Sequence, residues 1–427
     1  MLKIINIFIF LYCFSIGSLF LPSLIPRTTF VATVMLIVAI LLNSSIKISM
    51  PNLSGAAYRL RYVVENMHYG NLFIPTLGIL LFTVYMVLRS IYWPTRFVSN
   101  LSAVILLSFF LVFIVNTREY LTSYLKAYIW LVFVMSLFGV LAWILVMSGN
   151  YYIYDGVYVN LNEMTKGAFV RDEGATNSYV WPYYLGLIVT GETPLDIFGF
   201  SFYRLTGWAH EPSSATIFVV PAILLLFKGD VIKNFVIRAI FLTTIICFWL
   251  FCASVGSLLA VMVLLATYIL TTLYIKLFPF KMSLTIFLLL VSSIFFLILF
   301  FEPISESSLF STKFDMQSDT MNKAISRFLW FTHDATLTVP MINNDGKSIL
   351  EFHYFAYLTI WMIISLFLWI IASDTFATGK LSIYSIILMY LILHAMKGSY
   401  LTVYVHLSTF FWFFVAYFAM QKRFKYF

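Results

Sequence analysis

The segment YRLTGWAHEPSSATIF, residues 203–218, holds three ionisable side chains within eight residues, at the start of an apolar run. Arg204 suits a bidentate grip on phosphate and keeps its charge in a partly dry site. His210 and Glu211 can each take a proton from a hydroxyl group near neutral pH. Side chains of these types suit the displacement of a phosphate-linked leaving group, a reaction that needs no ATP.

Pro212 is predicted to be the first residue of a helix, because its missing N–H costs nothing at that position. Glu211 would then lie near the cap, with Ser213 and Ser214 in the first turn. The free N–H groups and the positive dipole end of such a helix attract anions. The alternative is structural: Glu211 caps the helix and forms a salt bridge with Arg204 at the membrane interface.

Two long polar segments carry further candidates, namely Arg171 in the first and Arg327 and His353 in the second. Their other charged residues, such as Lys313 and His333, are expected to be solvated. The chain holds no phosphate-binding glycine motif of the P-loop or dinucleotide type, and no H-E-x-x-H or CxxC motif. We therefore expect no cofactor and no metal ion.

The composition is that of a multi-span membrane protein. The chain has 427 residues, of which 62% are hydrophobic and 10% charged, whereas a soluble domain averages about 25% charged residues. The net charge of +8 is attributed to cytoplasmic loops rather than to nucleic-acid binding. Cys13, Cys247 and Cys252 lie in apolar runs and form no disulfide or zinc pattern.

The apolar runs predict an all-α membrane protein, since a bilayer core of about 30 Å needs roughly 20 apolar residues per helix. About twelve transmembrane helices are expected, at residues 4–21, 30–48, 72–89, 98–116, 126–147, 213–228, 235–252, 255–275, 283–301, 355–373, 382–396 and 399–420. The whole chain, 1–427, is one polytopic membrane domain.

The basic residues predict the orientation. If the N-terminus is cytoplasmic, the segments inside hold 15 of the 26 Lys and Arg residues and four of the 18 acidic ones. Both termini are then cytoplasmic, and the long loops 148–212 and 302–354 are external. The first loop contains NSYVWPYYLGLIVTG, residues 177–191, which is too short to span and is predicted to be re-entrant or interfacial.

RLTGWAHEPSSA, residues 204–215, resembles the R-x-x-G-x-x-x-E-P-S signature of the O-antigen polymerase (Wzy-type) family, which is grouped with the O-antigen ligases. Two further segments are similar to parts of that family: CASVGSLLA (252–260) to its serine-containing turn, and EFHYFAYLTIW (351–361) to its histidine-containing loop exit. The number of spans and the two large loops also match.

The resemblance implies a glycosyltransferase of the bacterial inner membrane that joins oligosaccharides linked to undecaprenyl diphosphate on the periplasmic face. Arg204, Arg327 and Arg171 would bind the diphosphate, and Glu211, His353 or His210 would activate the acceptor hydroxyl. The implied partners are the lipid-linked oligosaccharides, membrane lipids, a chain-length regulator and a flippase, but no nucleic acid.

Several aromatic residues of the first loop are candidates for stacking on sugar rings, above all Trp208 and Trp181, with Tyr183 and Tyr184 beside them. The alternative is an aromatic belt at the membrane interface.

Three other functions compete with polymerisation, and the least favoured of them is that of a binding or scaffold protein. An O-antigen ligase, which transfers the finished glycan to lipid A-core, shares the overall plan, and the E-P-S form of the motif favours the polymerase. A flippase or transporter would be expected to hold ionisable groups at mid-membrane, where His394 and His406 are the candidates.

Overall fold

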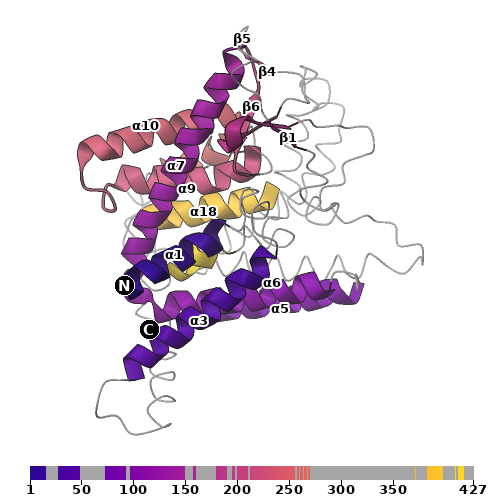
Figure 1. Ribbon diagram of the computed structural model, residues 1–427, viewed down its shortest axis with the longest axis vertical. Helices are drawn as coiled ribbons and strands as arrows, with labels where there is room; N and C mark the ends of the chain where they lie inside the picture. The colour runs from indigo at the N-terminus through magenta and orange to yellow at the C-terminus, as the bar shows by residue number, and fades with distance from the viewer. Residues whose placement is uncertain are drawn as a thin grey trace. The chain divides into compact units, whose positions relative to one another are not determined.

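The computed structural model describes residues 1–15, 27–48, 73–92, 97–149, 157–159, 179–189, 195–197, 200–209, 212–254, 257–258, 260–262, 264–266, 268–269, 371, 382–397, 409 and 412–417. This part of the chain is mostly helical (Figure 1). It divides into two compact units. Unit 1 comprises Met1–Ala32 and Glu119–Ser257, and unit 2 comprises Thr33–Arg118 and Leu258–Phe427.

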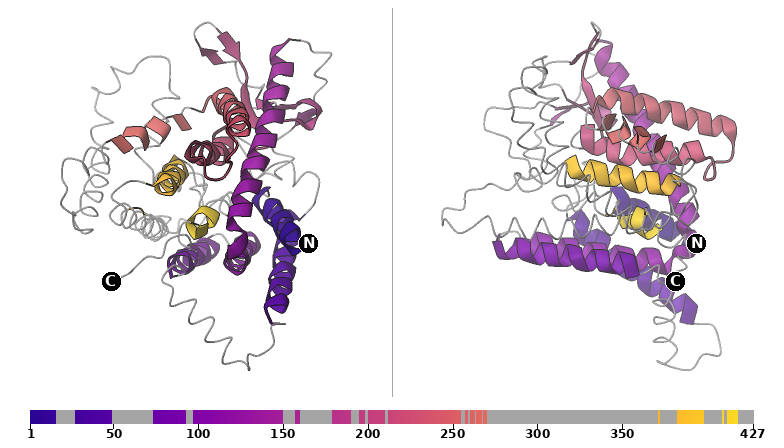
Figure 2. Two further views of the ribbon diagram at one scale, coloured as in Figure 1. Left: turned by 90° about the vertical axis from the view of Figure 1, so that its left-hand side faces the viewer. Right: turned by 180° about the vertical axis from the view of Figure 1, so that it is seen from behind.

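The described part of unit 1 contains α1 (Leu2–Ser15), α7 (Leu121–Met147), α9 (Pro212–Lys228) and α10 (Phe235–Cys252), together with the start of α3. A short 3-10 turn, η2 (Arg118–Tyr120), precedes α7. The helix α7 crosses α9 and α10 obliquely, as both Figure 1 and Figure 2 show. It also packs on α1, so α7 is the element that joins the helices of this unit.

Aromatic side chains make many of the contacts of α7. Tyr124 stacks on Phe10 of α1 with ring centroids 4.7 Å apart, and Phe133 stacks on Phe241 of α10 at 4.0 Å. Stacked rings of this kind stabilise a helix contact by about 0.5–1.5 kcal/mol beyond the area they bury. The continuous apolar sequence of α7, without an internal proline, allows a helix of 27 residues.

Among the described helices of unit 1, α9 has the largest share of buried side chains. Pro221 lies inside it and cannot donate the usual backbone hydrogen bond. In the same stretch the hydroxyl group of Tyr128, on α7, donates a hydrogen bond to the carbonyl oxygen of Phe218. This hydrogen bond joins α7 to α9 one residue after Ile217, the residue whose carbonyl group loses its backbone donor to the proline.

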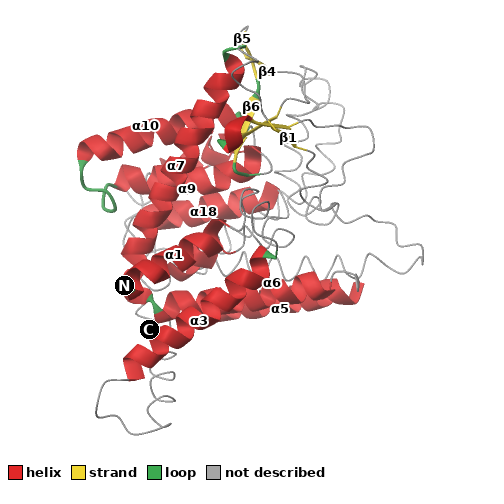
Figure 3. Ribbon diagram, in the orientation of Figure 1, coloured by secondary structure: helices red, strands yellow, loops and turns green. Residues whose placement is uncertain are grey.

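The loop between α7 and α9 contains short strands, drawn in yellow in Figure 3. An antiparallel four-stranded sheet has the order β1-β2-β3-β6, and a separate hairpin pairs β4 with β5. The strands are β1 (Val157–Val159), β2 (Tyr179–Trp181), β3 (Leu187–Val189), β4 (Leu195–Ile197), β5 (Phe200–Phe202) and β6 (Arg204–Gly207). A 3-10 turn, η3 (Pro182–Tyr184), joins β2 to β3.

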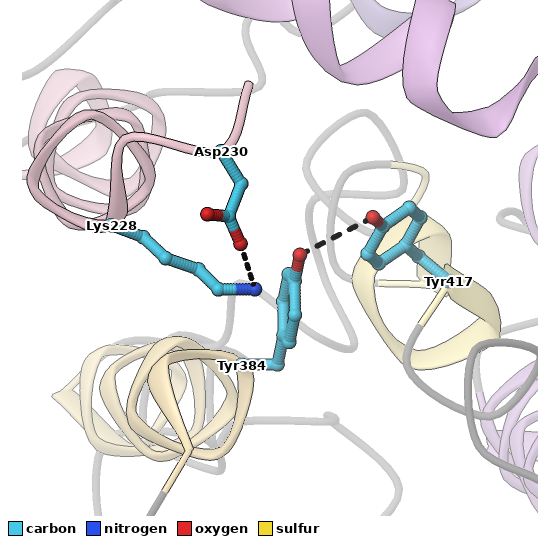
Figure 4. A network of polar contacts seen from close by, with 4 residues as sticks. All are labelled: Lys228, Asp230, Tyr384 and Tyr417. Atoms are coloured by element: carbon cyan, nitrogen blue, oxygen red, sulfur yellow. Dashed lines mark hydrogen bonds and ion pairs between the residues drawn. The ribbon is translucent and has the colours of Figure 1, made fainter. Parts of the chain in front are cut away.

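Unit 2 contains α5 (Phe73–Tyr92), α6 (Phe97–Asn116) and α18 (Ile383–Lys397), together with most of α3 (Thr28–Ile48). The side-chain amide of Asn100 on α6 donates a hydrogen bond of 3.0 Å to the hydroxyl oxygen of Ser90 on α5. The hydroxyl groups of Tyr384, on α18, and Tyr417 lie 3.4 Å apart (Figure 4).

Helices lie at the first seven predicted spans and at the eleventh, within the part of the chain that the structure describes. Two of the described helices are long and apolar enough to cross a membrane, Arg118–Met147 and Phe235–Cys252. The spans predicted at 283–301, 355–373 and 399–420 fall mostly outside the described residues, as does all of the second loop, 302–354. The total of twelve spans stays a prediction.

The all-α prediction is wrong for the first loop, which contains strands. Residues 177–191 are predicted to be re-entrant or interfacial, and in their described part, 179–189, Pro182 and Gly186 interrupt the apolar run. Between them Tyr183 has a left-handed backbone (φ 47°, ψ 29°), which turns the chain back on itself. The segment therefore folds as the hairpin of β2 and β3.

Candidate functional site

The candidate site is the junction of β6 and α9, where the ionisable segment enters the helix. Arg204 is the first residue of β6, is half-buried, and pairs with Val189 of β3. The strand β6 lies at the end of the strand order, and it contacts α7, α9 and α10. Helices thus cover a sheet edge that would otherwise expose unpaired backbone groups.

Trp143 of α7 holds the backbone next to Arg204. Its indole N–H donates a hydrogen bond of 2.9 Å to the carbonyl oxygen of Tyr203. The same ring stacks on Phe251 of α10, with centroids 3.9 Å apart and planes 10° from parallel, and meets Phe202 edge-on. The start of β6 is therefore fastened to both α7 and α10.

Three glycines let the loop backbone lie directly on α7. A Cβ atom added to Gly186 would lie 3.1 Å from the Cα atom of Gly139 on α7 and 3.5 Å from the Cα atom of Gly207. A Cβ atom added to Gly207 would lie 2.6 Å from the ring of Phe248 on α10. Gly207 also has φ +62°, a left-handed conformation that side chains rarely adopt. A larger residue at Gly186 would have to move the two backbones slightly apart, and one at Gly207 would have to displace the Phe248 ring.

The pairing of β3 with β6 is irregular at Thr206, the residue before Gly207. The buried hydroxyl group of Thr206 donates a hydrogen bond of 3.0 Å to the carbonyl oxygen of Leu187, while Leu205 pairs with Ile188. Bulges of this type locally bend a strand and change the direction of its side chains, and they are frequent beside functional sites.

Trp208 fastens the turn that follows β6. Its indole N–H donates a hydrogen bond of 3.2 Å to the carbonyl oxygen of Leu185. In the same turn the backbone N–H of Ala209 donates a hydrogen bond of 3.2 Å to the carbonyl oxygen of Thr206. The Trp208 side chain is half-buried, so part of its ring faces outward. Trp208 thus stabilises the turn and keeps part of its surface accessible.

The first turn of α9 is buried and polar. Pro212 occupies the first position, as the sequence predicts, and Ser213, Ser214 and Thr216 follow it inside the unit. The hydroxyl group of Thr216 donates a hydrogen bond of 2.7 Å to the carbonyl oxygen of Ser213. A helix start with hydroxyl groups and a positive dipole end is suited to an anion near its mouth.

The structure describes Arg204 at the start of β6 and Trp208 in the turn after it, both half-buried, whereas Trp181 is buried. Only 2% of the Trp181 side chain is exposed, so its ring offers no face to a sugar in this structure. Tyr183, in the turn next to it, is 52% exposed. The remaining predicted site residues lie outside the described part of the chain: His210, Glu211, Arg171, Arg327 and His353.

The sequence interpretation missed Trp143, Gly139 and Gly186. Trp143 lies near the end of an apolar run, where a tryptophan is ordinarily attributed to the interface belt. Gly139 had a detectable signal: it is the single glycine of the run 126–147. A glycine in a helix costs about 1 kcal/mol relative to alanine, so its presence there indicates close approach by another chain segment.

In the described part of the chain, no group of three or more His, Cys, Asp or Glu side chains comes together as a metal site would require. Comparison of the chain with protein-family models, with characterised proteins and with solved structures finds no significant match.

Proposed function

We propose that the protein is a membrane glycosyltransferase that polymerises oligosaccharide repeat units linked to undecaprenyl diphosphate into O-antigen or a related surface polysaccharide. The observation that carries the proposal is the position of Arg204. This permanent cation stands on a strand packed against α7 and α10, eight residues before the N-terminus of α9.

The proposed setting is the bacterial inner membrane, crossed about twelve times, with both termini cytoplasmic and the loops 148–212 and 302–354 periplasmic. Gly139, which meets Gly186, lies eight residues before the end of α7. That is about 12 Å along the helix axis. If α7 ends at the membrane surface, a contact at this depth lies within a hydrocarbon core of about 30 Å and supports the re-entrant alternative for residues 177–191.

In this proposal Arg204 binds the diphosphate of the donor lipid together with Arg171 and Arg327. Guanidinium groups suit this role because they form paired hydrogen bonds to phosphate oxygens and keep their charge when partly buried. The N-terminus of α9 adds a positive dipole end on the same side. Positive groups held in place before the reaction stabilise negative charge that develops as the leaving group departs.

In the proposed transfer step one glycosidic bond forms and one bond to the lipid diphosphate breaks. The acceptor hydroxyl oxygen of a newly exported unit forms a bond to the anomeric carbon of the growing glycan. The bond between that carbon and the diphosphate oxygen breaks, and undecaprenyl diphosphate leaves with the electron pair. Glu211, His353 or His210 takes the proton from the acceptor hydroxyl. The reaction needs no metal ion in this proposal.

Trp208 and Tyr183 are proposed to contact the sugars. Trp208 is half-buried in the turn after β6, and Tyr183 is exposed in the turn between β2 and β3. The hydrogen bond from Trp208 to Leu185 links the two turns that bear these rings. Aromatic rings fixed by the backbone can cover the apolar face of a pyranose at low entropic cost.

Deletion of the gene tests the function, with lipopolysaccharide separated by gel electrophoresis. A polymerase deletion should leave core that carries a single repeat unit, and the wild-type gene should restore long chains. Complete loss of glycan from the core would instead identify an O-antigen ligase. Accumulation of repeat units on the cytoplasmic face would identify a flippase or transporter. Either of the latter results would overturn the proposed polymerisation.

A further inference from the structure

We propose that residues 227–238 bind the headgroup of an anionic phospholipid. This segment comprises the end of α9, the connection to α10 and the first residues of α10, and is called the turn below. The inference rests on these helices crossing a membrane and is independent of glycan polymerisation. Within this turn lie three basic residues, Lys228, Lys233 and Arg238, and one acidic residue, Asp230. The Lys and Arg distribution along the chain places the turn on the cytoplasmic side, where anionic lipids attract basic segments.

The turn has a defined conformation. The ammonium group of Lys228 lies 2.7 Å from a carboxylate oxygen of Asp230 (Figure 4). Gly229 between them has φ +77°, and a Cβ atom there would collide with the guanidinium group of Arg238. Only glycine therefore allows Arg238 to lie against the backbone of the turn.

The start of α10 fixes Arg238 from the other side. The side-chain oxygen of Asn234 accepts hydrogen bonds from the backbone N–H groups of Val236 and Ile237, at 3.0 and 3.2 Å, and so caps the helix. The guanidinium carbon of Arg238 lies 5.7 Å from the centre of the Phe235 ring, which is within the range of a cation–π contact. A cation held in this way loses little freedom when it binds a phosphate group.

Exposed apolar side chains adjoin these cations. Phe235 is 71% exposed and Phe227 is 64% exposed, on either side of the turn. Lys233 between them is exposed as well. A free phosphate ion would use the cations alone, whereas a phospholipid would cover both the cations and the phenyl rings. The combination of charge and apolar surface therefore favours a lipid.

The test measures lipid binding by the full-length protein in detergent. Phosphatidylglycerol and phosphatidylcholine with the same acyl chains are titrated in, and bound lipids are counted by native mass spectrometry. We expect wild type to prefer phosphatidylglycerol. The double variant Lys233→Gln/Arg238→Gln should lose that preference, by roughly fivefold per cation removed.

A matched control removes the same net charge elsewhere. Lys3→Gln/Lys126→Gln changes two exposed lysines outside the turn and should keep the preference. Asp230→Asn should strengthen phosphatidylglycerol binding, because it removes a negative charge from the turn. If the substitution only damaged the turn, binding would weaken instead.

Three outcomes would overturn the inference. The first is that Lys233→Gln/Arg238→Gln still prefers phosphatidylglycerol. The second is that the control Lys3→Gln/Lys126→Gln loses this preference to the same extent. The third is displacement of phosphatidylglycerol by inorganic phosphate at the same concentration, which would show that the turn recognises phosphate without the lipid.

Discussion

The indole N–H of Trp143 and the carbonyl oxygen of Tyr203 form a hydrogen bond of 2.9 Å between residues 60 positions apart in the chain. It joins α7, which is long and apolar enough to cross a membrane, to the residue that precedes Arg204. Because the same indole ring stacks on Phe251 of α10, the cation on β6 is placed by two helices at once.

Replacing Trp143 with Phe should lower stability modestly. The phenyl ring can still stack on Phe251, but the hydrogen bond to Tyr203 is lost, which costs about 1 kcal/mol. Thermal unfolding of the purified protein in detergent measures the change. Trp130→Phe is the matched control, because Trp130 is 51% exposed on the same helix. Equal shifts in the two variants would contradict the proposed role of this hydrogen bond.

Gly207→Ala should destabilise the protein more than Gly149→Ala. Both glycines have positive φ values, +62° and +68°, so both alanines incur the left-handed penalty of about 1–2 kcal/mol. A Cβ atom added to Gly149 would have no atom within 4 Å other than those of the adjacent residues. A Cβ atom added to Gly207 would lie 2.6 Å from the ring of Phe248. Crowding of this kind adds about 1–3 kcal/mol. The two unfolding temperatures measure the difference, and an identical shift would rule out tight packing at Gly207.

Arg204→Ala should abolish chain extension while the amount of protein in the membrane stays normal. Loss of one group that stabilises a developing anion typically slows a reaction by about 10²–10³-fold. Arg204→Lys keeps the charge without the paired hydrogen bonds and should retain partial activity. Chain length on a lipopolysaccharide gel gives the readout, with Lys126→Gln as a charge-removing control. Wild-type chains in Arg204→Ala would remove this residue from the site.

Tyr183→Ala should change the length of the glycan chains, whereas Trp181→Ala should lower the stability of the protein. Tyr183 is 52% exposed, so its loss should shorten the glycan chains and leave the unfolding temperature nearly unchanged. Trp181 is 2% exposed, and removal of so large a buried ring costs about 3–5 kcal/mol. Parallel measurements of chain length and thermal unfolding separate the two effects. If Tyr183→Ala behaves like Trp181→Ala, the exposed tyrosine has a structural role.

Much of the helical framework could be predicted from the sequence alone. The predicted spans 126–147 and 235–252 coincide closely with α7 and α10, and Pro212 begins α9 as predicted. Long apolar runs predict helices well because every backbone group is satisfied within its own segment. No distant partner has to be known for such a prediction.

The strands depended on tertiary structure. Each has three or four residues, too few to show a period, and each is stable only beside its neighbours in the sheet. The position of Arg204 also depends on tertiary structure, since Trp143, Gly139 and Gly186 come from other parts of the chain. The sequence therefore determined which residue carries the charge and that a helix begins at Pro212 soon after it. Only the folded chain decided that the strand bearing this charge lies on α7, because close backbone contacts between distant segments leave no local pattern.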